Sequence, residues 1–252
     1  MYTTNPNNLN PEQWNSSGVS AEGTAIRTFM RNVFGWMFGA LVITALTSYA
    51  FGNIPELMEL LYKFKGGRIV GFQVLGTVLI FAPFILVLVM NIAYNKLSFF
   101  ALVGFFILFS LVFGVSISTI FIRYSMPTIG ASFAIAAGMF GTMAIMGFTT
   151  KADLTNFGGM LKMALFGLVI AIIVNIFMRS DMMQYVISLA GVAIFTGLTA
   201  YDVQKLKQIG GGITYGTESA AKLSIMGALT LYLDFINIFL FLLRLMGGGS
   251  RK

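Results

Sequence analysis

The sequence predicts an all-α protein that crosses a lipid bilayer with seven helices. Of its 252 residues, 57% are hydrophobic and only 10% are charged, whereas a soluble domain carries about 25% charged residues. Too few polar groups are present to cover a water-facing surface. The chain also contains seven apolar stretches of the length that a membrane-spanning helix needs, about 20 residues. We therefore expect the bilayer to be the main partner of this protein.

The first apolar stretch follows a polar segment, residues 1–26, which is rich in Asn and Ser and contains Pro6 and Pro11. We expect this segment to be a mobile tail. It lacks the basic start of a signal peptide, and the apolar run that follows is too long for one, so we interpret that run as a spanning helix. Because no long polar linker interrupts them, residues 27–246 are expected to form one transmembrane domain, with residues 247–252 as a short polar tail.

The remaining boundaries follow from charged residues, glycines and prolines between the apolar stretches. Gly35 and Gly39 form a GxxxG pattern, which favours close helix packing. Pro83 lies in the middle of the second stretch, where it is expected to kink or break the helix, with a gating hinge as an alternative. The short connections favour antiparallel neighbours. The expected helices cover approximately residues 30–52, 70–92, 98–122, 128–149, 158–178, 183–204 and 223–245.

The composition excludes several kinds of chemistry. The chain has no cysteine and no histidine, which removes thiol redox chemistry, Cys/His zinc sites and Ser-His or Cys-His nucleophiles. No cofactor is expected. The net charge of +7 is interpreted as basic residues at helix ends that meet anionic lipid. No basic block interleaved with aromatic residues suggests nucleic acid as a partner. Basic residues are spread almost evenly over the two membrane sides, so charge alone does not determine the orientation.

Two of the nine acidic residues, Asp202 and Asp234, fall in apolar stretches. Asp234 lies twelve residues after Lys222 and ten before Arg244, which places it near the middle of the membrane. An ionised aspartate at the centre of a helix costs roughly 2.5–3.5 kcal/mol on the insertion scale. Asp234 must therefore face the bundle interior or water. A structural hydrogen bond, for example to Asn237, is the alternative to a functional role.

Asp202 is followed closely by Lys205 and Lys207, so it could simply mark the wet end of a helix. It gains meaning from Asp234 on the next helix. Two carboxylates about 4 Å apart repel by roughly 4 kcal/mol at an effective dielectric of 20, so the pair is expected to share one proton. That proton would hydrogen-bond the sixth helix to the seventh. Its loss at higher pH would expose an anionic patch, which predicts a pH-operated gate with affinity for cations.

The depths of the two carboxylates raise a difficulty for this pairing. Counted from the nearest lysines at about 1.5 Å per residue, Asp202 lies roughly 5 Å deep and Asp234 roughly 18 Å deep. The two groups meet only if the sixth helix starts lower, if Lys205 extends along the helix towards the membrane surface, or if the seventh helix begins before the lipid boundary.

The segments TAYDVQKLK (residues 199–207) and LYLDFINIFLFLLRLMG (residues 231–247) resemble the Bax inhibitor-1 family of seven-helix membrane proteins. The resemblance covers roughly residues 27–246 and implies six helices around a central seventh. It also implies a pH-sensitive calcium leak, with Asp202 and Asp234 as the paired proton sensor and with Tyr201, Asn237 and Pro83 as candidate supporting residues. The amino terminus would be cytoplasmic, in a bacterial inner membrane, and a membrane protease is the partner of some bacterial members.

The sequence departs from the family pattern in its second stretch. Some members carry an Arg and a Glu there, and the Arg locks one aspartate in the closed state. Here the stretch has no charge, and its only amides are Gln73 and Asn91, so the latch would depend on the other aspartate. Calcium takes 6–8 oxygen ligands. Asp202 and Asp234 would therefore form a weak, transient cation site, which suits conduction better than storage.

Two other functions remain open from the residues. Tyr201-Asp202 on one helix and Asp234 on the next match the outline of an intramembrane aspartyl protease, although Leu231-Tyr232-Leu233 precedes Asp234 where that family has Gly-x-Gly. A non-conducting regulator of another membrane protein would use the aspartates only as structural fasteners. We predict a calcium leak rather than an enzyme.

Overall fold

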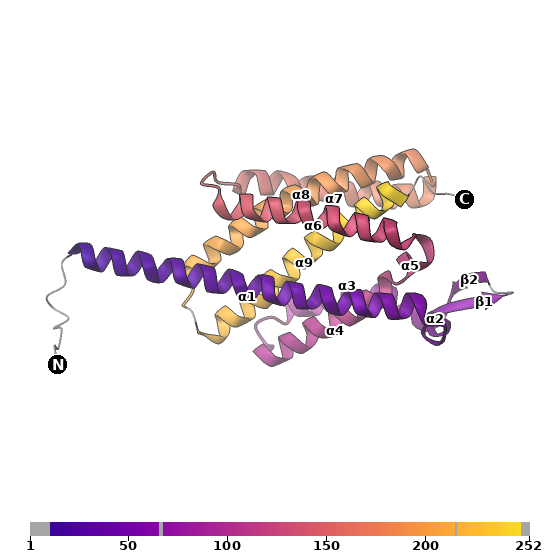
Figure 1. Cartoon of the computed structure of the whole chain (residues 1–252), viewed down its shortest axis with the longest axis horizontal. Coiled ribbons are helices and arrows are strands. Elements are labelled where there is room, and N and C mark those ends of the chain that lie inside the picture. Colours follow the sequence, from indigo (N-terminus) through magenta and orange to yellow (C-terminus); the bar gives the residue numbers. More distant parts are fainter. Residues whose placement is uncertain (1–10, 66–67, 215, 248–252) are drawn as a thin grey trace.

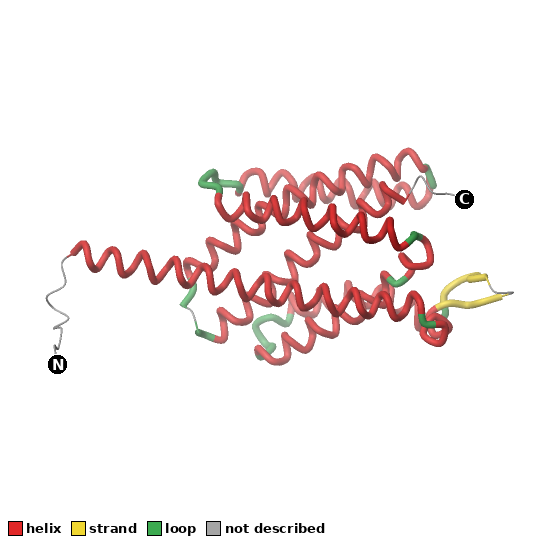
Figure 2. The backbone as a smooth tube through the Cα atoms, viewed as in Figure 1, coloured by secondary structure: helices red, strands yellow, loops and turns green. Residues whose placement is uncertain are grey.

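The computed structural model describes residues 11–65, 68–214 and 216–247, and these residues are mainly helical (Figure 2). Seven helical segments within them are long and apolar enough to cross a membrane, which confirms the predicted fold class. The elements are α1 (Pro11–Asn53), α2 (Pro55–Leu61), β1 (Tyr62–Lys65), β2 (Arg68–Phe72), α3 (Val74–Ile92), α4 (Phe99–Ile117), α5 (Thr119–Arg123), α6 (Met126–Thr149), α7 (Thr155–Met178), α8 (Asp181–Gly212) and α9 (Glu218–Gly247).

The first helix is longer than the hydrophobic pattern indicated. α1 begins at Pro11, so residues 11–26 of the predicted tail are helical, whereas residues 1–10 lie outside the described part of the chain. Proline suits the first helical position because its missing N–H would have no partner there. Residues 248–252 of the predicted C-terminal tail also lie outside the described residues.

The connection between the first two spanning helices forms a small structured unit. α2 leads into an antiparallel hairpin in which Tyr62 pairs with Phe72. The buried Tyr62 side chain forms a hydroxyl–hydroxyl hydrogen bond of 3.0 Å with Ser118, at the break between α4 and α5. This two-stranded sheet was not expected from the sequence, because the segment is short and mixes charged with apolar residues.

The last helix occupies the centre of the bundle, as predicted. In the most apolar window of α9, 72% of the residues are buried, against 56% in α8 and 6% in α7. In Figure 1, α9 crosses between α6, α7 and α8 on one side and α1, α3 and α4 on the other. It packs directly on α1, α4, α6 and α8, while α3 packs chiefly on α4 and α7 chiefly on α8. The central helix therefore has four direct neighbours and two outer ones.

A buried polar cluster fixes one face of α9. Tyr232 is fully buried, and its hydroxyl lies 2.8 Å from the Thr44 hydroxyl of α1. Thr44 donates its own proton to the Ser110 carbonyl of α4 at 2.9 Å, so Tyr232 is the donor to Thr44. The Tyr232 ring also packs edge-to-face on Phe109 and Phe113, with ring centroids 5.3 and 5.8 Å away. These contacts bind α9 to α1 and α4.

The structure bears on two packing predictions from the sequence. α3 continues as one helix through the buried Pro83, so the helix is not broken there, because a packed membrane helix tolerates the loss of one backbone hydrogen bond. A Cβ atom added to Gly35 or Gly39 would meet nothing within 4 Å, so the GxxxG pattern brings no other described helix close to α1.

Other glycines do bring helices together. A Cβ atom on Gly147 of α6 would collide with the Ala200 carbonyl of α8, and one on Gly158 of α7 would collide with the Tyr201 ring. Both collisions lie within two residues of Asp202 along α8. These glycines therefore set how closely α6 and α7 approach the acidic part of α8.

We expect Gly147→Ala to destabilise the protein by about 1–3 kcal/mol, because the added methyl group meets backbone that cannot rotate away. That loss corresponds to a fall of several degrees in the melting temperature for a chain of this size, measured by thermal unfolding in detergent. Gly138→Ala is the matched control on the same helix, since its Cβ atom meets nothing within 4 Å. Equal melting temperatures for the two variants would contradict the close contact between α6 and α8.

Candidate functional site

The contact between α8 and α9 brings Asp202 and Asp234 together. The two carboxyl groups lie within hydrogen-bonding reach of each other. Asp234 is only 4% exposed, and Asp202 is half-buried. Among the described residues, no donor reaches the buried Oδ2 atom of Asp234. A hydrogen bond between two carboxyl groups requires a proton on one of them, so this arrangement is able to hold one proton.

The two helices that carry the carboxylates are longer than the depth count from the sequence assumed. α8 continues through Lys205 and Lys207 as far as Gly212, and α9 already begins at Glu218. Both helices extend beyond the boundaries expected from the sequence. The lysines therefore lie along the side of a longer helix rather than at its end.

Lys162 on α7 is a charged neighbour of Asp202 that the sequence analysis missed. The Lys162 ammonium donates to the Tyr201 hydroxyl at 3.3 Å and lies 4.7 Å from the centre of that ring. Lys162 and Lys205 both attract the Asp202 carboxylate electrostatically. Lys162 is the only charged residue in the apolar stretch 158–178, and this signal was overlooked because only carboxylates were sought in such stretches.

The connection between α6 and α7 is fastened to α8 just beyond Asp202. The Gln204 side chain accepts from the Leu154 N–H at 2.9 Å and donates to the Ala152 carbonyl at 2.7 Å. Three residues further along α8, the Lys207 ammonium donates to the Phe148 carbonyl at 2.7 Å, in the last turn of α6. Cations are favoured at that end of a helix. A shift of α8 would therefore also move this connection.

The other predicted supporting residues lie in different surroundings. Tyr201 does lie beside Asp202 and covers Gly158. The Asn237 amide instead donates to the Leu233 carbonyl one turn earlier in α9, at 2.7 Å, a bond that amide side chains form readily within helices. The expected hydrogen bond from Asn237 to Asp234 is therefore not formed. Pro83 lies on α3, which packs chiefly on α4.

The site offers few oxygen ligands to a cation. The described residues contain no group of three or more Asp, Glu, His or Cys side chains that could hold a metal ion. Asp202 and Asp234 supply two carboxyl groups, and calcium prefers 6–8 oxygens. Any cation held here would need water or backbone carbonyls as additional ligands, which favours weak binding.

Comparisons with known proteins are consistent with this architecture. The model of the family described as "Inhibitor of apoptosis-promoting Bax1" matches residues 26–251. Inner membrane protein YbhL of Escherichia coli K12 is 42% identical over 233 residues, which cover 92% of this chain and 96% of YbhL. An uncharacterized protein of Caulobacter vibrioides is 38% identical over 225 residues, or 89% of this chain and 90% of that protein. These matches extend well beyond the two motifs in α8 and α9, and the chain belongs to the Bax inhibitor-1 family of multi-pass membrane proteins.

Proposed function

We propose that this protein is a pH-sensitive calcium leak of the bacterial inner membrane, gated by a proton that Asp202 and Asp234 share. The observation that carries the proposal is a carboxyl group in the centre of the bundle, 4% exposed, within hydrogen-bonding reach of a second carboxyl group. The name of the Escherichia coli relative, an inner membrane protein, supports the location. In this proposal the amino terminus is cytoplasmic.

The shared proton closes the gate because it joins α8 to α9. At low pH the protonated pair forms a hydrogen bond across the two helices. When the proton leaves, two carboxylates about 4 Å apart would repel by roughly 4 kcal/mol at an effective dielectric of 20. In this proposal the repulsion moves α8 relative to α9, which Tyr232 holds against α1 and α4. Calcium flux is therefore expected to rise as pH rises.

Lys162 modifies this equilibrium from α7. The charged groups close to Asp202 are Lys162, Lys205 on the same helix and Asp234 on α9. Both lysines favour the ionised form of Asp202 and therefore favour opening, whereas Asp234 opposes the second negative charge. The α3 helix contributes no charge to this balance.

In liposomes containing the purified protein, we expect calcium uptake to increase between pH 6 and pH 8. Asp202→Asn and Asp234→Asn should each abolish this pH dependence, because an amide does not titrate and one shared proton needs two acids. The measurement is the fluorescence of a trapped calcium indicator at several pH values.

Asp153→Asn provides the matched control. Hydrogen bonds from the Thr155 hydroxyl and N–H lower the pKa of Asp153, in the connection before α7, so this residue stays ionised from pH 6 to 8. A wild-type pH profile in Asp202→Asn or Asp234→Asn would refute the sensor assignment. No uptake at any pH would instead support a non-conducting regulator, and inhibitor-sensitive cleavage of a helical membrane substrate would support an aspartyl protease.

Lys162→Gln should shift the midpoint of the flux profile to higher pH, because Asp202 then loses a cation that stabilises its ionised form. The Lys162 side chain is exposed on the surface of the bundle, so an interaction of about 0.2–1 kcal/mol is expected, equivalent to roughly 0.2–0.7 pH units. The control is Lys151→Gln, which removes an equal charge from the connection between α6 and α7. A shift to lower pH, or equal shifts in both variants, would contradict a specific role for Lys162.

A further inference from the structure

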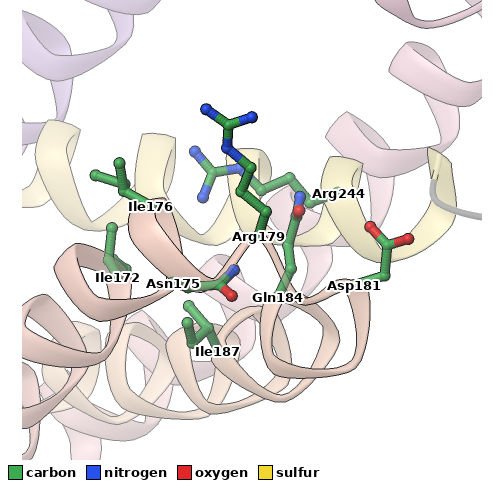
Figure 3. Close-up of a pocket in the computed structure, with 8 residues that line it drawn as sticks. All are labelled: Ile172, Asn175, Ile176, Arg179, Asp181, Gln184, Ile187 and Arg244. Carbon is green, nitrogen blue, oxygen red and sulfur yellow. The ribbon is translucent and has the colours of Figure 1, made fainter.

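A polar cavity lies at the opposite end of the bundle from the α6–α7 connection. It has a volume of about 490 Å³ and forms where α7 ends, α8 begins and α9 approaches its last turn (Figure 3). The polar lining comes from Arg179, Arg244, Asn175, Gln184 and Asp181. None of these residues takes part in the contact between Asp202 and Asp234.

The lining favours an anion. Two guanidinium groups, from Arg179 and Arg244, face this cavity against a single carboxylate, Asp181. In Figure 3 the two arginine side chains project in the same direction from different segments, whereas the Asp181 side chain projects to the other side of the view. The planar fork of arginine donors matches the oxygens of a phosphate group, which a pair of arginines can bind from two sides.

Arg179 has an unusual backbone conformation, which the neighbouring hydrogen bonds fix. Its φ angle is 52°, in the left-handed region that residues other than glycine rarely adopt. The next residue, Ser180, donates its N–H to the Asn175 side chain at 3.1 Å, and its hydroxyl accepts from the Met183 N–H at 3.2 Å. These bonds fix the turn between α7 and α8. Such unfavourable geometry tends to persist where function requires it.

The apolar residues of the cavity indicate which kind of molecule bears the anionic group. Ile176, in the last turn of α7, and Ile172, one turn earlier, line the same cavity. At the same ends of α7 and α8, Phe177 and Met182 expose 82% and 75% of their surface, as expected for side chains that meet lipid. An anion that enters here is placed next to acyl chains.

We propose that this cavity binds the phosphate group of an anionic phospholipid headgroup. Arg179 and Arg244 contact the phosphate oxygens, the amide of Gln184 donates to the headgroup, and the isoleucines contact the first part of an acyl chain. The site is independent of the proposed calcium leak, so either proposal can fail without the other.

The test measures lipid binding by the full-length protein in detergent, by native mass spectrometry and by the rise in melting temperature on lipid addition. Phosphatidylglycerol should bind and stabilise the wild-type protein more than phosphatidylcholine does. Arg179→Gln/Arg244→Gln should weaken phosphatidylglycerol binding by about tenfold or more, the loss expected for charged hydrogen bonds. Lys63→Gln/Lys65→Gln, which removes two exposed charges from β1, is the control and should bind as the wild type does.

Arg179→Gly separates a binding defect from a folding defect. Glycine adopts the left-handed conformation without strain, so this variant should keep the melting temperature of the lipid-free wild type and still lose phosphatidylglycerol binding. Unchanged lipid binding in Arg179→Gly and in the double arginine variant would overturn the site. Equal losses in the β1 control would indicate general surface charge instead. If inorganic phosphate or soluble glycerophosphoglycerol stabilised the protein as well as the lipid, the lipid assignment would be wrong.

Discussion

A carboxylic acid in the middle of a buried membrane helix needs a partner, and in this protein the partner is another carboxylic acid. Asp234 lies on the central helix and meets Asp202 on α8. Two acids can share a hydrogen bond only while one of them is protonated. In the proposed function, a proton is therefore part of the contact between these two helices. That contact is also the most extensive between any two helices in the described chain, so its geometry matters to the whole bundle.

The helices around this contact form two parts of the bundle. On one face of α9, Tyr232 reaches Thr44 and, through it, Ser110, which joins α9 to α1 and α4. On the other face, α8 is held to α6 and α7 by close contacts at Gly147 and Gly158. These helices share backbone contacts and side-chain hydrogen bonds with α8, so they are coupled to any displacement of it. The acid pair lies at the boundary between the two parts.

The two ends of α8 have different chemistry. Towards Gly212 the helix carries Asp202 with its lysines, and at its start it lies beside the arginine-lined cavity. One region carries carboxyl groups beside lysines, and the other carries two arginines. α8 is a continuous helix of 32 residues between them. Both regions are completed by side chains of α7 and α9, so the same three helices form both.

The sequence by itself determined the class of this protein and pointed to its two exceptional residues. Apolar stretches of about 20 residues predict spanning helices because the bilayer allows few alternatives, and a carboxylate inside such a stretch is conspicuous for the same reason. Only the tertiary structure decided what these residues contact. The extension of α8 to Gly212, the approach of Lys162 and the turn of Asn237 towards its own helix depend on how helices tilt and pack. The bilayer requires apolar side chains on a spanning helix but does not determine which helices contact one another. Patterns such as GxxxG at Gly35 and Gly39 therefore could not show which helix faces would meet.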